Sequence, residues 1–229
     1  SVDEMLRQMA KSYRRKIPDD LALTVQIDIG DPGSSWHVLV EPGRRVTVGR
    51  GGHEGSQFAL RMTGATLRRI YAGELTALTA AARARVSDPA PLDFEMGKGA
   101  QLTPQRYATL LAFVQRFFNR SEPERIVLEE DRSRSVHGAH AIPLYYHPGF
   151  RSAWYVVKPG ERLNEPGDTN PFPQAFVFIS GDGWATIGDR TVRVRAGEAY
   201  YVPPSSDHVV WTESDQPLSL IFLAWGEEA

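Results

Sequence analysis

The spacing of hydrophobic residues changes near residue 120, and the change predicts two differently built halves. An apolar stripe at helical spacing runs from Val2 to Tyr13, and Pro18 ends that helix. Residues 23–29 alternate strictly between apolar and polar, as in a strand with one buried face. Further elements expected here are strands at 36–40, 45–48, 58–62 and 92–96, helices at 65–72, 75–85 and 102–118, and a turn at 31–33. This mixture predicts an α+β domain over residues 1–118.

The second half is expected to contain short strands and turns. Val192 and Val194 alternate with Arg193 and Arg195, which predicts one core face and one solvent face. The expected strands are 126–128, 140–146, 152–158, 174–179, 183–187, 191–194, 199–202, 208–211 and 218–225. Short strands separated by Pro and Gly indicate an all-β sandwich or barrel. We expect that domain at 125–229, after a polar linker at 119–124.

Composition and charge exclude several classes of function. The chain has 229 residues and a formal net charge of −2, which gives no basic footprint for nucleic acid. It has no cysteine, which excludes disulfides, thiolate nucleophiles and zinc–thiolate sites. No window reaches the roughly 18 apolar residues of a spanning helix, and the charged first turn does not resemble a secretory signal. We therefore expect a cytoplasmic protein that does not insert into membranes.

Two glycine-anchored segments of the second half show a clear family resemblance. One runs from Gly160 to Gly181, and the other has the spacing Gly197, five residues, Pro203, four residues, His208. These segments resemble the two motifs of the cupin family. The resemblance implies an all-β cupin barrel, a double-stranded β-helix, with His208 pointing into its interior.

The metal ligands that the cupin resemblance would imply are mostly replaced. Where the family has His-x-His and a following Glu, this chain has Pro166, Asp168 and Gln174. A proline side chain cannot bind a metal, and a neutral amide is a weak ligand. We expect no tightly bound cofactor, with a divalent transition metal at His208 as the alternative. The imidazole either hydrogen-bonds a neighbour such as Gln174 or orients a ligand at the barrel mouth.

The first half resembles the sterol carrier protein type 2 domain in the order of its elements. That order is a helix, a strand meander, two helices and a returning strand. The matching segments are Val25–Ile29, Trp36–Val40, the Gly43 turn and Gly73–Thr76, whereas 83–91 departs from the family. The resemblance implies a sterol-carrier-like domain around an apolar tunnel for lipids, acyl chains or sterols.

The aromatic residues of the second half predict the kind of ligand that the barrel would bind. Strand alternation sends about half of such side chains inward, where they suit a flat apolar or phenolic molecule. The expected ligand-binding residues are His208, Gln174, Asp168, Phe176, Phe178, Tyr201 and Trp211.

These residues favour a protein that binds or carries a small apolar or aromatic molecule, or an accessory protein of a pathway. The alternative is a cupin-type enzyme, an isomerase, cyclase, lyase or oxygenase that uses His208. We also expect a homodimer, because relatives in this family commonly pair and open sheet edges tend to be covered. Sedimentation showing only monomer at high concentration would contradict that expectation.

Overall fold

The computed structural model describes residues 1–30 and 34–229, and the chain divides into two compact units. Unit 1 contains residues 1–81 and 89–126, and unit 2 contains residues 82–88 and 127–229. The turn expected at residues 31–33 lies outside the described residues. Among the described residues, no helix is both long and apolar enough to cross a membrane.

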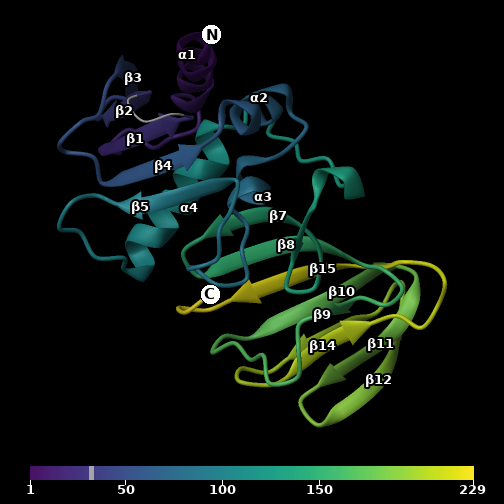
Figure 1. Ribbon diagram of the computed structural model, residues 1–229. Helices are drawn as coiled ribbons and strands as arrows, with labels where there is room; N and C mark the ends of the chain where they lie inside the picture. The colour runs from purple at the N-terminus through teal and green to yellow at the C-terminus, as the bar shows by residue number, and fades with distance from the viewer. Residues whose placement is uncertain (31–33) are drawn as a thin grey trace. The chain divides into compact units, whose positions relative to one another are not determined.

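Unit 1 is a five-stranded sheet with helices (Figure 1). Its elements are α1 (Val2–Tyr13), β1 (Leu23–Ile29), β2 (Ser35–Glu41), β3 (Arg45–Arg50), β4 (Phe58–Met62), α2 (Gly64–Ala72), α3 (Ala77–Ala81), β5 (Leu92–Met96) and α4 (Pro104–Phe117). The strand order is β3-β2-β1-β4-β5, and only the β1–β4 pairing is parallel. The crossover from β3 to β4 therefore places β4 on the far side of β1.

The core of unit 1 forms where the alternating face of β1 meets the apolar stripes of the helices. Alternate residues of β1, from Leu23 to Ile29, are buried, as the strand pattern predicted. Tyr13 of α1 packs edge-on against Phe113 and Phe117 of α4, with ring centroids 5.4 and 5.6 Å apart. Burying such aromatic side chains stabilises a domain by about 1.5–3 kcal/mol each.

Local capping explains where the helices of unit 1 begin and end. The Thr103 hydroxyl accepts a hydrogen bond from Arg106 N at 3.2 Å, and Pro104 occupies the first helical position of α4. Gly73 ends α2 in the left-handed conformation at φ 76°. The helix expected at 75–85 ends at Ala81, so that prediction was too long.

Residues 82–88 form a turn that belongs to unit 2 in place of the rest of that helix. Arg85 N donates to the Asp88 carboxylate at 2.9 Å, and the Arg134 guanidinium donates to the carbonyl oxygen of Ala82. These contacts override the high helix propensity of the alanine-rich sequence. The segment 119–124, which was expected to be a linker, is fixed to α1, because the Glu122 carboxylate accepts a hydrogen bond from Arg15 at 2.9 Å.

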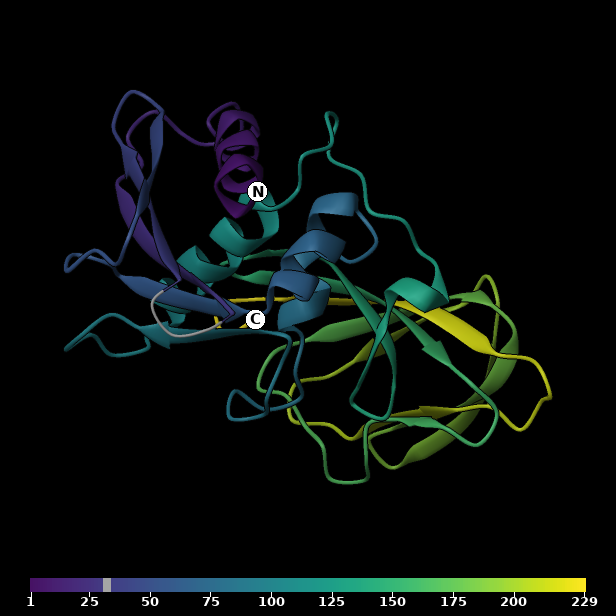
Figure 2. The ribbon, with the colours of Figure 1, turned by 45° about the horizontal axis from the view of Figure 1, so that its top comes forward.

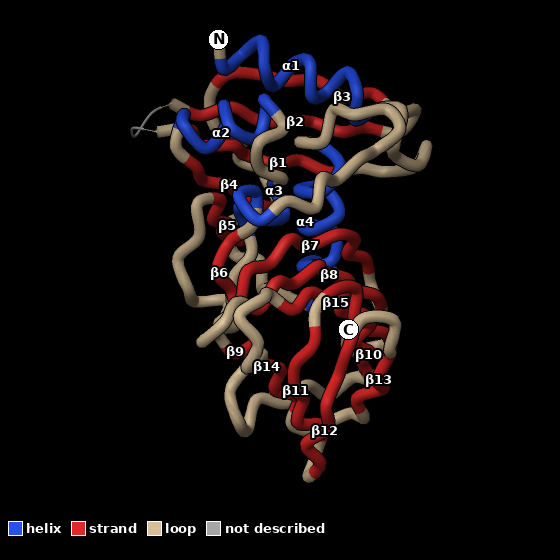
Figure 3. The backbone as a smooth tube through the Cα atoms, turned by 90° about the vertical axis from the view of Figure 1, so that its right-hand side faces the viewer, coloured by secondary structure: helices blue, strands red, loops and turns tan. Residues whose placement is uncertain are grey.

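Unit 2 consists of two antiparallel sheets that pack face to face (Figures 1 and 2). Its elements are η1 (Glu130–Arg132), β6 (Arg134–Val136), β7 (Ala139–His147), β8 (Phe150–Val157), β9 (Arg162–Leu163), β10 (Gln174–Ser180), β11 (Asp182–Ile187), β12 (Arg190–Arg195), β13 (Ala199–Val202), β14 (His208–Trp211) and β15 (Leu218–Trp225). One sheet has the order β13-β10-β15-β8-β7-β6, and the other β12-β11-β14-β9. Strands dominate this unit (Figure 3).

Two expectations for unit 2 need correction. The sheets do not close into the barrel that was expected, because no strand pairing joins the six-stranded to the four-stranded sheet among the described residues. Each sheet instead buries one face against the other, as in a sandwich. The strand expected at 126–128 is absent because β6 occupies that edge of the larger sheet, and Leu128 stays 43% exposed.

The glycines that anchor the two sequence motifs all have backbone conformations that other residues rarely adopt. Gly160, Gly181 and Gly197 have φ values of 85°, 77° and 87°. At Gly181 an added Cβ would also lie 2.4 Å from the carbonyl oxygen of Pro217. The motif glycines therefore form turns in which most other residues would be strained.

Candidate functional site

Gln174 is a buried polar side chain that lacks a hydrogen-bond partner. It is the first residue of β10 and is 1% exposed. It shares with Phe176 and Phe178 the face of the strand that points into unit 2. Neither Nε2 nor Oε1 of its amide has a hydrogen-bond partner among the described residues. Leaving buried polar groups unsatisfied costs about 1–3 kcal/mol. Such a cost in an otherwise packed interior marks a candidate binding group.

Aromatic rings lie directly beyond Gln174 along β10. The Phe176 ring lies 6.5 Å from Phe178 and 6.5 Å from Phe222 of the neighbouring strand β15, measured between centroids. Phe176 also lies 6.1 Å from the imidazole of His208, which belongs to the opposing sheet. The amide of Gln174 and the ring of His208 therefore flank one aromatic wall.

His208 is buried and has both ring nitrogens engaged. It is 3% exposed at the start of β14. Its Nδ1 lies 3.0 Å from the carbonyl oxygen of Ser206, so Nδ1 carries the proton in that bond. Asn170 Nδ2 then donates to Nε2 at 3.2 Å. This pair of bonds is consistent with a neutral imidazole with a defined tautomer.

Two loops meet at this end of unit 2 and hold His208 in place. Asn164 donates from Nδ2 to the carbonyl oxygen of His208 at 2.9 Å. Ser205 N donates to the carbonyl oxygen of Asn170 at 2.7 Å, and Gly167 N donates to the Asp207 carboxylate at 3.2 Å. Hydrogen bonds thus connect residues 164–173, which lead into β10, with residues 203–207, which lead into β14.

Sequence reasoning missed the two asparagines of this site. Asn164 has φ 65°, a left-handed conformation that asparagine tolerates better than most residues, and it is 9% exposed. Loop residues show no periodicity, so hydrophobic patterning could not locate Asn164 or Asn170. The one signal that the sequence offered was the placement of two asparagines in the loop that leads into the Gln174 strand.

The structure does not bring the other three predicted site residues to Gln174. Asp168 is exposed, and its carboxylate accepts from Glu165 N at 2.9 Å within its own turn. Tyr201 is 57% exposed and lies against Trp225, because Val202 takes the inward position of β13.

Trp211 also points away from the core. Val210 takes the inward position of β14, and the Arg162 guanidinium lies 4.9 Å above the centroid of the Trp211 ring. Tyr201, Trp211 and Asp168 therefore do not line the site that Gln174, Phe176, Phe178 and His208 form.

The donor set of this site does not fit a transition metal. Among the described residues, no three His, Cys, Asp or Glu side chains cluster as a metal site requires. The lone pair of His208 Nε2 accepts from Asn170, and the neighbouring candidate Gln174 is a neutral amide. A metal ion would have to displace Asn170 and find its remaining ligands among neutral amides such as Gln174, which these ions bind weakly.

Metal content gives a direct prediction. The purified protein is expected to contain far less than one equivalent of Fe, Mn, Ni, Cu or Zn per chain by elemental analysis, because the donor set is too poor. One equivalent of any of these metals that disappears in His208→Ala would contradict the prediction. His147→Ala, an exposed histidine, serves as the control for adventitious binding by imidazole.

His137 adds a pH-sensitive group near His208. It sits in the β6–β7 turn at φ 56°, and its carbonyl oxygen accepts from Asn164 N at 2.8 Å. Burial lowers the pKa of the His137 imidazole, His208 adds to that lowering, and Asp168 and Asp88 partly oppose it. The protonated form is therefore disfavoured in the folded protein.

This shift predicts acid sensitivity. The folded-state pKa of His137 lies below its unfolded value of about 6.5, so the unfolded chain takes up the proton first. Its contribution to the free energy of unfolding is therefore neutral above about pH 7 and becomes destabilising as the pH falls below about 6.5. His137→Asn, which suits the left-handed backbone, is expected to reduce the loss of stability between about pH 7 and about pH 5 in urea unfolding. An unchanged slope, equal to that of the control His147→Asn, would contradict it.

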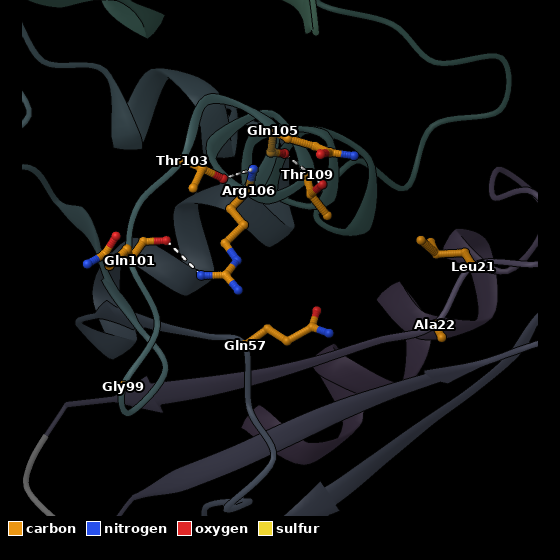
Figure 4. A pocket seen from close by; sticks show the side chains of 9 residues that line it. All are labelled: Leu21, Ala22, Gln57, Gly99, Gln101, Thr103, Gln105, Arg106 and Thr109. Atoms are coloured by element: carbon orange, nitrogen blue, oxygen red, sulfur yellow. Dashed lines mark hydrogen bonds between the residues drawn. The ribbon is translucent and has the colours of Figure 1, made fainter.

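Unit 1 has a separate open groove of about 780 Å³ near the start of α4 (Figure 4). Its lining includes Gln57, Gln101, Thr103, Gln105, Arg106 and Thr109. The Arg106 guanidinium donates to the carbonyl oxygen of Gln101 at 2.9 Å. Leu21 and Ala22 add apolar surface to this lining, so the groove is an open, mixed surface and not the enclosed apolar tunnel that the sterol-carrier resemblance implied.

Comparison with known proteins identifies a cupin domain in unit 2. Residues 153–224 match the family described as Cupin domain. One similar solved structure, a Cupin 2 conserved barrel domain protein from Salinispora arenicola, shares 23% identity at a TM-score of 0.41 over 45% of this chain and 88% of that chain. Another, the plu4264 protein from Photorhabdus luminescens, shares 18% identity at a TM-score of 0.41 over the same fractions.

A third similar structure is an RmlC-like cupin from Shewanella frigidimarina. It shares 15% identity at a TM-score of 0.37 over 42% of this chain and 82% of that chain. The comparison with curated proteins gave no significant match. These findings do not support the sterol-carrier resemblance of residues 1–118.

Proposed function

We propose that the cupin domain of residues 153–224 binds a small uncharged molecule beside Gln174 and His208, and that the chain acts as a binding or carrier protein. Cupin domains occur in both binding proteins and enzymes. The observation that carries the proposal is the Gln174 amide, which is 1% exposed and has neither polar atom paired within the part of the chain that the structure describes. A ligand that hydrogen-bonds both atoms would remove an energetic cost that the protein alone does not.

The enzymatic alternative has less support from the same contacts. Both nitrogens of His208 are engaged by Ser206 and Asn170, so proton transfer would require those bonds to break. Tyr155, a buried phenol in the core of unit 2, has its pKa raised by burial, which makes it a poor base at neutral pH. Binding requires neither group to change its protonation state.

For unit 1 we propose a sterol-carrier-like fold with an accessory role. The order helix, three strands, crossover strand, two helices and returning strand supports the resemblance. The open groove beside α4, in which amides, hydroxyls and Arg106 stand next to Leu21 and Ala22, weighs against an enclosed lipid cargo there. Self-association also remains a proposal, and it is supported by the exposed Tyr201 on β13, the edge strand of the larger sheet.

Native mass spectrometry tests the proposed function. Protein isolated under mild conditions is expected to carry a small organic molecule in addition to its 25.5 kDa chain, released on denaturation. Protein that is isolated free and retains nothing from a cell extract would contradict the proposal.

Substitution of His208 gives the corresponding affinity prediction. His208→Ala is expected to weaken binding of the co-purified molecule by about 0.5–1.5 kcal/mol in titration calorimetry, through loss of the hydrogen bonds that hold the two loops. Trp211→Ala is the matched control, because Trp211 is on the outer face of the same strand. Equal affinity in both variants and in the unmodified protein would remove His208 from the site.

A further inference from the structure

The Gln174 amide limits the chemistry of its ligand, because it presents a donor and an acceptor side by side. Nε2 donates and Oε1 accepts, in one plane, and both are unpaired among the described residues. A group with a single hydrogen-bonding atom would leave half of the amide unsatisfied and would still incur part of the desolvation cost. The complementary partner carries an acceptor next to a donor, as another amide does.

The surroundings favour an uncharged ligand. No Asp, Glu, Lys or Arg is among the buried residues that the structure describes. The hydrogen bonds of His208 fit its neutral form, and burial lowers the pKa of the nearby His137. The half-buried Arg151, two strands from Gln174 in the register of β10, β15 and β8, lies over the Phe172 ring. A carboxylate at Gln174 would therefore be buried without a cation bonded to it, at a cost far above the gain from two hydrogen bonds.

The walls of the site favour a flat molecule. Phe176 is the next inward residue after Gln174 on β10, and it contacts Phe178, Phe222 and His208 through ring pairs 6.1–6.5 Å apart. Rings at these separations pack on one another, and a planar ring that enters beside them would extend the same kind of aromatic contact. The phenylalanine rings have no polar atom, and both nitrogens of His208 are already bonded to Ser206 and Asn170, so polarity must be confined to the edge that faces Gln174.

We propose that the ligand is a flat, uncharged ring with an N–H beside a C=O, the lactam edge found in pyridones and pyrimidine bases. The C=O accepts from Gln174 Nε2 while the N–H donates to Gln174 Oε1. This inference depends on the proposed function, since it specifies the ligand of the same site.

Entry of such a ring requires the loop at 164–173 to move. Residues 165–169 of that loop are exposed, and its contacts with the 203–208 segment include Asn170 to His208, Asn170 to Ser205 and Gly167 to Asp207. Asn170→Ala removes the first contact and keeps the second, which uses the backbone. The variant is expected to speed association of the ring while Gln174 still selects it.

The test uses two rings that differ by one methyl group. Binding of 2-pyridone and of N-methyl-2-pyridone is measured by protein NMR titration, which reports dissociation constants in the millimolar range. N-methylation removes the N–H and is expected to weaken binding at least about tenfold, because one hydrogen bond is lost and Gln174 Oε1 is left unpaired. Benzoate, a charged ring of similar size, is expected to bind more weakly than 2-pyridone.

Variants assign any preference to Gln174. In Gln174→Met the two pyridones are expected to bind with equal affinity, whereas Gln216→Met, an exposed glutamine, retains the preference. Equal affinity of the two pyridones for the unmodified protein, or tighter binding of benzoate, would overturn the lactam assignment and leave the proposed function intact. This comparison needs no variant to fold. If no ring binds and no molecule co-purifies, the proposed function fails together with the assignment.

Discussion

Phe176→Ala is expected to lower the free energy of unfolding by about 3–5 kcal/mol, the largest effect among our predictions. The side chain is 1% exposed and contacts the rings of Phe178, Phe222 and His208. Truncation to alanine removes the transfer energy of the ring and leaves a cavity that a two-sheet core cannot fully close. Four of the five tryptophans, at 154, 184, 211 and 225, belong to unit 2, so tryptophan fluorescence in a urea titration follows the unit that contains Phe176.

Tyr201→Ala is the matched control for this measurement. Tyr201 is an aromatic residue on β13, paired with β10, but it is 57% exposed, so its removal is expected to cost less than about 1 kcal/mol. If Phe176→Ala cost no more than Tyr201→Ala, Phe176 would not lie in a packed interior.

Gln174→Met is expected to raise the stability of the ligand-free protein by about 1–3 kcal/mol while it abolishes selective binding. Methionine has nearly the same length and shape and places no polar atom in the interior, so the cost of the unpaired amide disappears. A gain in stability coupled to a loss of binding is the behaviour of a residue retained for function. Thermal or urea unfolding of both proteins, after ligand is removed, measures the difference.

Gln216→Met is the control for the second prediction. Gln216 is exposed in the same unit, and the change is expected to alter stability by less than about 0.5 kcal/mol. A loss of 1 kcal/mol or so in Gln174→Met would mean that the amide has protein partners in solution, and it would contradict the assignment of Gln174 as a binding group.

Strand alternation predicted one side of the candidate site and not the other. Along β10 the buried positions Gln174, Phe176 and Phe178 alternate with less buried ones, so the inward face was readable from the sequence. On β13 and β14 two apolar residues stand next to each other, Tyr200 with Tyr201 and Val209 with Val210. Either member could face the core, and hydrophobicity alone does not decide the phase.

Loops and tertiary contacts account for the rest of what the sequence left undetermined. The motif spacing from Gly197 to His208 predicted an inward imidazole, and His208 is buried, but its partners Asn170 and Ser206 lie in aperiodic loops. Helix propensity extended a helix to residue 85, whereas contacts of the Ala82 carbonyl and Asp88 carboxylate direct 82–88 into unit 2. Local preferences of this size are routinely overridden by tertiary contacts.

A crystal structure of the protein as isolated tests the central claim most directly, because it shows what contacts the Gln174 amide. The account predicts density for a flat organic molecule against Phe176, with one atom within about 2.7–3.2 Å of Nε2 and a neighbouring atom within the same distance of Oε1. An amide whose two polar atoms are bonded to protein groups, or to ordered water alone, would contradict it.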